Sequence, residues 1–251
     1  MNHILGLIHA VLPAYNEVRN LGDLLARFGA ARWGDQVEGC RLVVVDDGST
    51  DGTGEIARSA GEGLDIEVIR HPENEGLAAA LLTGIEHVVT QGKEGDIVVF
   101  MDADDTHDPA ALPEMVQPFA AGADCVIASR YRPGSCQVGV PWLRRFLSRG
   151  ANLLFRALFR LPGVRDYTCG FRVVRWTVLQ QAWAVHGRDL IRAQGFACTD
   201  EFLLRIAPFV QRFEEVSFVL RYDRKQGASK LQWGRTITNT LYILWRFWRA
   251  R

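Results

Sequence analysis

Short apolar runs alternate with helical patterns through the first half of the chain, and this alternation limits the fold more than any other feature. Five segments read as strands, namely "IHAVLPAYNE", "RLVVVDDGS", "DIEVIRH", "DIVVFMD" and "ADCVIASR". The segments between them carry apolar residues at helical spacing, as in "NLGDLLARFGAA". Continuous apolar strands are typical of a sheet that is buried on both faces. The alternation therefore predicts an α/β fold with a mostly parallel twisted sheet and helices on both faces.

The length and the cysteines agree with an intracellular domain of this kind. The chain has 251 residues, which is enough for one large α/β domain with an appended element. Its five cysteines are odd in number and widely spaced, so we expect a reducing cytosol and no disulfide framework. The first residues lack the basic start of a signal peptide. No apolar run reaches the ~18 residues of a membrane-spanning helix, and we expect a cytoplasmic protein.

The net charge of zero hides a division between the two halves of the chain. Residues 1–129 carry 7 Lys and Arg against 22 Asp and Glu, whereas residues 130–251 carry 22 against 7. Such asymmetry indicates two surfaces with different partners, and the alternative is two solvated faces that attract each other. Nucleic acid is not an expected partner, because the acidic half would repel a polyanion.

Polar side chains gather at the ends of the expected strands. The clusters are "PAYNE" at 13–17, "DDGSTDGT" at 46–53 and "DADD" at 102–105, with "HPENEG" at 71–76 as a fourth candidate. Ligands of parallel α/β sheets bind at the carboxyl ends of the strands, so we expect these clusters to form one site. The patterns of a dinucleotide-binding loop and of a Walker loop are absent, which argues against NAD-type oxidoreductases and P-loop kinases.

The acids in "MDADDTHDP" are crowded enough to need a partner. Like charges as close as Asp102, Asp104 and Asp105 repel one another. An Asp-x-Asp pair fits Mg²⁺, which takes one or two carboxylates together with substrate phosphates. The alternative is a solvated turn in which Asp108 caps the next helix. Asp47, in "VVVDDGSTDGT", is a candidate acceptor of hydrogen bonds from a nucleobase edge or a ribose hydroxyl.

Two segments of the second half read as amphipathic helices. One, at 141–163, gathers four arginines within an arc of roughly 60°, and these are Arg145, Arg149, Arg156 and Arg160. The C-terminal helix gathers apolar residues on one face, and these are Ile237, Leu241, Leu244, Trp245 and Trp248. We expect peripheral membrane contact, because basic amphipathic helices lie on anionic lipid and Trp favours the bilayer edge. Solvated arginines, or a dimer or partner interface, are the alternatives.

Seven motifs in chain order resemble a known family. They are "LPAYNE", "VVVDDGSTDGT", "MDADDTHDP", "ASRY", "SRGAN", "DYTCGFR" and "RKQGASK". They make residues 8–235 similar to the inverting family 2 glycosyltransferases of the GT-A fold, and within these to the dolichol-phosphate mannose synthases and bacterial polyprenyl-phosphate sugar transferases. The resemblance implies a GT-A domain over 1–235, with a nucleotide-binding half at 1–130 and an acceptor-side half at 131–235. Residues 236–251 are then an aromatic helix that faces a membrane or a partner.

The resemblance also implies roles for individual residues. The nucleoside of a GDP- or UDP-sugar is expected at Pro13, Tyr15, Glu17, Val45, Asp47, Asp102 and Ala103. Mg²⁺ or Mn²⁺ is expected at Asp102, Asp104 and Thr106. The donor diphosphate and the acceptor phosphate are expected at Arg130, Arg144, Arg224 and Lys230, with Glu201 on the acceptor side. The residues implied as catalytic are Asp104, Arg130, Arg224 and Lys230. Asp105 and Asp200 stand where relatives usually have other residues.

The implied reaction moves a hexose from a sugar nucleotide to a polyprenyl phosphate with inversion, and GDP-mannose is the first expected donor. The enzyme would lie peripherally at the cytoplasmic face of the membrane, and a small membrane subunit is a further candidate anchor. Two alternatives stay open. One is a family 2 transferase with a hydroxyl acceptor on a glycan, protein or small molecule, for which Asp200 or Glu201 would supply the catalytic carboxyl group. The other is a non-catalytic nucleotide-binding module.

Overall fold

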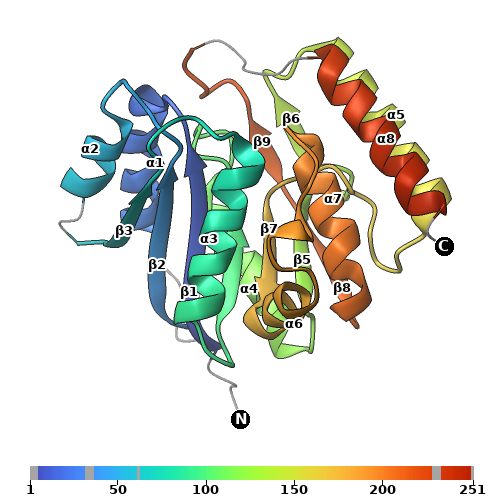
Figure 1. Cartoon of the computed structure of the whole chain (residues 1–251), viewed down its shortest axis with the longest axis horizontal. Helices are drawn as coiled ribbons and strands as arrows, with labels where there is room; N and C mark the ends of the chain where they lie inside the picture. Colours follow the sequence, from blue (N-terminus) through green and yellow to red (C-terminus); the bar gives the residue numbers. More distant parts are fainter. Residues whose placement is uncertain (1–4, 32–36, 61–62, 228–232, 250–251) are drawn as a thin grey trace.

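Seven strands form the central sheet in the order β3–β2–β1–β4–β7–β5–β8, in a computed structural model that describes residues 5–31, 37–60, 63–227 and 233–249 (Figure 1). The strands are β1 (Leu5–Ala14), β2 (Val37–Asp46), β3 (Asp65–Arg70), β4 (Ile97–Phe100), β5 (Cys125–Ser129), β7 (Arg172–Arg175) and β8 (Phe213–Ser217). Neighbouring strands are parallel, except that β7 runs antiparallel to both β4 and β5. The mostly parallel sheet expected from the sequence is therefore confirmed.

Helices cover both faces of this sheet, as the alternating pattern predicts. The α-helices are α1 (Val18–Ala30), α2 (Thr53–Ser59), α3 (Leu77–Gln91), α4 (Leu112–Ala120), α5 (Trp142–Phe159), α6 (Trp176–His186), α7 (Ala197–Ile206) and α8 (Trp233–Arg249). Short 3-10 helices are η1 (Pro109–Ala111), η2 (Gly187–Leu190) and η3 (Ala207–Phe209). In Figure 1, α3, α6 and α7 lie in front of the sheet, and α1 and α4 lie behind it. Strand β4 is buried along its whole length between these layers.

The register brings the polar clusters to one edge of the sheet. Ala14 at the end of β1 pairs with Asp46 at the end of β2, and Val11 pairs with Phe100 at the end of β4. Because β7 is antiparallel, it pairs Arg172 with Phe100, so the segment that precedes β7 reaches this same edge. A short parallel sheet of β6 (Cys136–Val138) and β9 (Val219–Arg221) lies above it (Figure 1).

Helices α5 and α8 lie side by side on the outside of the molecule (Figure 1). Helix α8 includes most of the C-terminal segment expected as a helix, and it packs on α7 as well as on α5. Its residues Ile243 and Leu244 are buried. Within the described ranges, none of the helices combines the length and the apolar character that crossing a membrane requires.

Candidate active site

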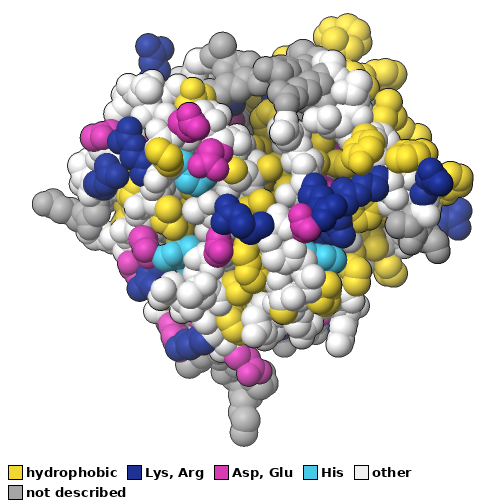
Figure 2. Space-filling view, in the orientation of Figure 1, with side chains coloured by type: hydrophobic (Ala, Val, Ile, Leu, Met, Phe, Trp, Pro, Cys, Tyr) yellow, Lys and Arg dark blue, Asp and Glu magenta, His cyan; other side chains and the backbone are white. Residues whose placement is uncertain are grey.

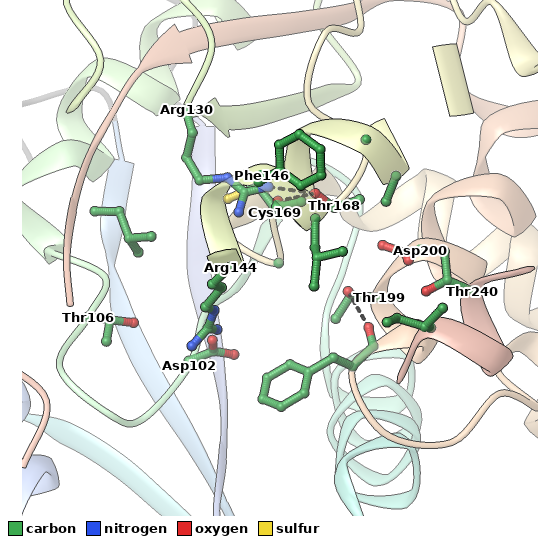
Figure 3. A pocket seen from close by; sticks show the side chains of 18 of the residues that line it. Asp102, Thr106, Arg130, Arg144, Phe146, Thr168, Cys169, Thr199, Asp200 and Thr240 are labelled. Atoms are coloured by element: carbon green, nitrogen blue, oxygen red, sulfur yellow. Dashed lines mark hydrogen bonds between the residues drawn. The ribbon is translucent and has the colours of Figure 1, made fainter. Parts of the chain in front are cut away.

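Two cavities meet at the loop that follows β4. The strand-end cavity, of about 530 Å³, is lined by the ends of β1 and β2, by residues 74–78 and by Lys225. The helix-side cavity, of about 380 Å³, is lined by α5, α8 and the segments around Arg130 and Thr168 (Figure 3). Asp102, Asp104 and Phe196 line both cavities. The Asp-x-Asp pair therefore stands at the junction of the two.

Most of the residues expected at a nucleoside reach the strand-end cavity. These are Pro13, Tyr15, Glu17, Asp47, Asp102 and Ala103. Val45 does not line it, because its side chain is fully buried in β2, where the sheet packs against its helices. The expected site thus forms at the predicted edge of the sheet, without a side-chain contribution from Val45.

Asp47 shapes the wall of the strand-end cavity. Its Oδ1 accepts a hydrogen bond from the Glu75 N–H at 2.9 Å, and its Oδ2 accepts one from the Gly76 N–H at 2.8 Å. The Nδ1 of His71 lies 2.8 Å from the same Oδ1. Gly48 is needed beside it, since a Cβ there would lie 2.3 Å from the Glu73 carbonyl carbon and φ is +69°. Asp47 therefore holds the segment 73–76 in place, a role that the nucleotide-contact interpretation did not include.

The two acids at the junction have different surroundings. Burial alone would raise the pKa of Asp104, but the Lys225 ammonium and the hydrogen bonds from Lys225 and Thr106 lower it. Asp104 Oδ2 lies 2.5 Å from Lys225 Nζ, and Oδ1 accepts the Thr106 hydroxyl at 2.7 Å. Asp102 receives no comparable bond within the described residues, and desolvation raises its pKa above the ordinary value despite the opposing charge of His107. Asp102 is thus the less compensated carboxylate of the two, with His107 Nε2 4.0 Å from its Oδ2.

His107 and Asp105 support this loop from opposite sides. The backbone N–H of Asp102 donates to Nδ1 of His107 at 3.1 Å, and the His107 ring stacks on Phe171. Asp105 is buried with φ +59°, and both of its oxygens lie 2.9 Å from the Arg27 guanidinium. The third acid lines neither cavity and ties the loop to α1 through a bidentate ion pair.

The donor set at the junction fits a hard divalent cation. Within the described ranges, no group of three His, Cys, Asp or Glu side chains could hold a metal by itself. Mg²⁺ and its analogues usually bind one or two carboxylates and complete their shell with water and substrate phosphates. Asp104 already holds a cationic group, the Lys225 ammonium, where a metal would stand. Asp102, Asp104 and the Thr106 hydroxyl therefore suit a metal that arrives with a phosphate ligand.

The helix-side cavity presents two arginines. Burial alone would lower the pKa of Arg130, but the Asp166 carboxylate raises it above its ordinary value. Arg130 donates from Nε and Nη2 to Asp166 at 2.8 and 2.7 Å, and from Nη2 to the Thr168 hydroxyl at 2.6 Å. These bonds leave its Nη1 group without a partner in the described part of the chain. Arg144, in the first turn of α5, lies over the Tyr222 ring at 4.8 Å and points toward Asp102 (Figure 3).

The rest of this cavity is largely apolar. Its walls include Phe146, Leu147, Ala151 and Leu154 of α5 and Ile237, Leu241 and Leu244 of α8. Buried Cys169 also lines it, and desolvation raises the pKa of its thiol to about 12, so the thiol is unreactive at neutral pH. Beyond the cavity, apolar side chains of α5 and α8 stay exposed, among them Trp142 at 77% and Leu153 at 66% (Figure 2). One side of the cavity thus continues into an apolar surface.

Two of the expected phosphate-side residues, Arg224 and Glu201, line neither cavity. Arg224 lines neither cavity, because its Nη1 pairs with Asp108 Oδ2 at 2.7 Å. Glu201 is fully buried, and its Oε2 accepts from the Arg192 and Ala193 N–H groups at 2.7 and 2.6 Å. Lys230 lies outside the described residues.

The sequence reasoning missed Lys225, although it follows Arg224 in the motif "RKQGASK". It also missed Phe196, which stands where the two cavities meet. Asp200, the neighbour of Glu201, lines the helix-side cavity because adjacent residues of α7 point about 100° apart.

A mostly parallel α/β sheet with an Asp-x-Asp loop at the junction of two cavities is the arrangement expected of a GT-A transferase. Residues 10–183 match the model of glycosyl transferase family 2, and the chain belongs to this family. The Micrococcus luteus undecaprenyl-phosphate mannosyltransferase is 32% identical over 89% of this chain and 87% of its own length. The Pyrococcus furiosus dolichol-phosphate mannosyltransferase is 32% identical over 95% of this chain, which spans 63% of that relative.

Solved structures share the fold at lower sequence identity. The mannosyl-3-phosphoglycerate synthase of Rubrobacter xylanophilus superposes with a TM-score of 0.67 over 98% of this chain and 75% of its own, at 19% identity. The glucosyl-3-phosphoglycerate synthase of Mycobacterium tuberculosis, solved with Mn²⁺ and uridine-diphosphate-glucose, gives 0.66 over 95% of this chain and 80% of its own, at 22% identity. These likenesses confirm the expected GT-A fold.

Proposed function

We propose that the chain transfers a hexose from a sugar nucleotide to a polyprenyl phosphate and inverts the anomeric carbon. The observation that carries this proposal is the meeting of two unlike cavities at Asp102 and Asp104. One is polar and open to the strand ends, as a nucleotide requires. The other joins two arginines to apolar helix walls, which suits a phosphate on a hydrocarbon chain. Relatives named for dolichol-phosphate and undecaprenyl-phosphate mannosyl transfer support the same acceptor class.

On the donor side, Tyr15, Glu17 and the segment 74–78 surround the nucleoside, and GDP-mannose is the donor that we propose first. Asp102, Asp104 and Thr106 would hold Mg²⁺ or Mn²⁺. When bound, such a cation neutralises the diphosphate and stabilises the charge that it gains as a leaving group. Asp105 and Arg27 keep the loop in its shape throughout the reaction, because neither residue of this ion pair lines a cavity.

On the acceptor side, the Nη1 group of Arg130 and the guanidinium of Arg144 bind the lipid phosphate. A phosphate monoester has a second pKa near 6, so it is mainly dianionic at neutral pH and needs no general base. One of its oxygens attacks the anomeric carbon from the side opposite the diphosphate. The new carbon–oxygen bond forms while the bond to the diphosphate breaks, and the nucleoside diphosphate leaves with the electron pair. Asp166 and Thr168 keep the Arg130 guanidinium in position for this step.

The prenyl chain lies along the apolar walls between α5 and α8 and continues into the membrane. The exposed apolar residues of these helices form the apolar face, defined as Trp142, Leu143, Phe146, Leu153, Leu154, Ile237, Leu241, Tyr242, Trp245 and Trp248 (Figure 2). Peripheral contact at the cytoplasmic leaflet follows, because apolar side chains enter the interface while nearby arginines meet anionic headgroups. A small membrane subunit could add a second anchor on this face.

Product mass tests the proposal. The full chain is incubated with Mg²⁺, a short prenyl phosphate and, in turn, GDP-mannose, UDP-glucose and other sugar nucleotides. We expect one donor to give a prenyl-phosphate-hexose and the matching prenyl alcohol to give nothing. A product formed only on hydroxyl acceptors would overturn the lipid-phosphate assignment. Failure of every donor with every acceptor would favour a nucleotide-binding module without catalysis.

A hydroxyl acceptor is the second candidate, and Asp200 is the observation that favours it. Its carboxyl group is buried, lines the helix-side cavity and receives no hydrogen bond within the described residues (Figure 3). Desolvation raises its pKa to about 7, which suits a general base. Under this alternative Asp200→Asn abolishes turnover, whereas transfer to a phosphate dianion survives the substitution.

A further inference from the structure

The contact between Lys225 and Asp104 joins a lysine of the basic loop, defined as residues 221–227, to the proposed metal site. Lys225 Nζ lies 2.5 Å from Asp104 Oδ2, and the two side chains are only 10% and 13% exposed. Both line the strand-end cavity. An ammonium held this closely by a carboxylate is a charge-assisted pair that is shielded from solvent.

This contact leaves neither oxygen of Asp104 without a partner. Thr106 donates to Oδ1 from its backbone N–H at 3.2 Å and from its hydroxyl at 2.7 Å, and Lys225 takes Oδ2. A metal ion that binds Asp104 must therefore share an oxygen with one of these donors or replace it. Lys225 is the one that carries a positive charge, so it is the group that a divalent cation would repel most strongly.

The basic loop does not depend on Lys225 for its position. The Arg221 N–H donates to the Thr106 carbonyl at 3.0 Å, and Arg224 pairs with Asp108. Gln226 exchanges two hydrogen bonds with Asn20 of α1, at 2.8 and 3.1 Å. These contacts lie on both sides of Lys225 in the chain. The ammonium can therefore leave Asp104 by side-chain rotation while the backbone of the loop stays over the strand-end cavity.

We propose that Lys225 is a resident cation of Asp104 that gives up this carboxylate to the donor's metal and binds the donor's diphosphate instead. The proposal rests on the proposed function, because it assumes a metal-bound sugar nucleotide. Without nucleotide, the displaced ammonium has no equivalent partner, so Lys225 opposes metal binding. With nucleotide, the diphosphate supplies that partner. Lys225 thus makes metal and nucleotide bind cooperatively, and it disfavours a metal-loaded site without a donor.

Mn²⁺ binding tests this inference without an activity measurement. The full-length chain and its Lys225→Met variant are titrated with Mn²⁺, followed by electron paramagnetic resonance, in the absence and in the presence of GDP or UDP. We expect Lys225→Met to bind Mn²⁺ alone about tenfold more tightly and to lose most of the enhancement that nucleotide gives the wild type, a change within the usual range of coupling effects. Lys93→Met is the matched control, since Lys93 is 67% exposed and lies beside Glu38.

The outcomes separate the inference from the function on which it rests. One outcome would overturn the role of Lys225 and leave the metal site intact. In it, the wild type binds Mn²⁺ tightly with nucleotide, but Lys225→Met binds Mn²⁺ alone with an unchanged or weaker affinity. No Mn²⁺ binding by the wild type in either condition would overturn the metal site itself, and Asp104→Asn then matches the wild type. Thermal unfolding of each variant confirms that it is folded before titration.

Discussion

The two cavities neutralise charge in different ways. In and around the strand-end cavity, acids are matched by nearby groups of the chain: Asp47 by backbone N–H groups, Asp105 by Arg27, and Asp104 by Lys225. The helix-side cavity sets two arginines opposite the junction acids, and Arg130 keeps one guanidinium nitrogen without a partner within the described residues. In the described part of the chain, the first region has no close cation at Asp102, and the second offers a guanidinium nitrogen to an anion. A metal-bound diphosphate and a lipid phosphate would supply both.

This difference explains why the acids of residues 101–109 are tolerated. Crowding three carboxylates would be costly if each stayed charged and desolvated. Two of them have cationic partners within 2.9 Å, whereas Asp102 lies 4.0 Å from His107, so Asp102 depends most on an external cation. The division of net charge along the sequence therefore follows the proposed chemistry: acids hold the metal and shape the donor site, and arginines receive the acceptor.

Removal of Asp104, at the junction of the two cavities, should have the largest effect on the rate of transfer. We expect Asp104→Ala to lower transfer by at least about 10³-fold, because it removes a metal ligand and the stabilisation of the leaving group. Asp105→Asn is the matched control in the same loop: it weakens the Arg27 pair and should keep activity within about tenfold while costing ~1–2 kcal/mol of stability. Steady-state rates and urea unfolding measure both. Normal turnover of Asp104→Ala, or of the wild type in EDTA, would refute the metal role.

Loss of the oriented Arg130 guanidinium should have the second largest effect on transfer. Arg130→Lys keeps the charge but cannot hold Asp166 through two nitrogens and still offer a third to a phosphate, so we expect about 10²-fold lower kcat/KM for the lipid phosphate. Arg132→Lys, on an exposed residue of the following turn, is the control and should match the wild type. If Arg130→Lys kept full activity, the helix-side cavity would not be the phosphate site.

The apolar face should have a smaller effect that depends on the acceptor. We expect Trp142→Ser with Leu153→Ser to weaken binding to anionic vesicles by about tenfold or more, because each substitution loses apolar area that the interface would bury. Activity on a long-chain prenyl phosphate in vesicles should fall in parallel, while activity on a short soluble one stays unchanged. Val185→Ser on α6 is the control, since Val185 is 65% exposed and lies outside the apolar face. Equal flotation of both variants would speak against membrane contact here.

The strand-end cavity could be predicted largely from the sequence. Each of its motifs is a contiguous segment directly after a strand, and the strand ends of a parallel sheet meet at one edge. The partners of its acidic side chains could not be predicted in this way. Asp105 pairs with Arg27 across 78 positions, and Asp47 binds the Glu75 N–H across 28, so only the folded chain shows these pairs.

Prediction of the residues of the helix-side cavity depended on the family resemblance. Its residues come from separate elements, and their side chains are placed by helix phase and long-range packing. The expected acid, Glu201, faces the loop before α7 and the Arg246 side chain, whereas Asp200 faces the cavity. Strand β7 shows the same limit. Its four residues are paired antiparallel between β4 and β5, and that direction depends on contacts that no local pattern contains.

Asp200 offers the last and smallest effect on turnover. It is the acid of the helix-side cavity that belongs to neither the metal loop nor an ion pair, and burial raises its pKa from 3.8 to about 7. Between about pH 4 and 7 the folded chain therefore binds one more proton here than the unfolded chain, so the free energy of unfolding falls as pH rises through that window. Above about pH 7 this loss of stability stays constant. Asp200→Asn should stabilise the protein at pH 8 by a few kcal/mol, with an upper limit of about 4, and by little near pH 4. Urea unfolding of both proteins at the two pH values measures this difference, and equal stabilities at pH 8 would contradict it.

Transfer to a lipid phosphate by Asp200→Asn should change less than about twofold, because the dianion needs no base.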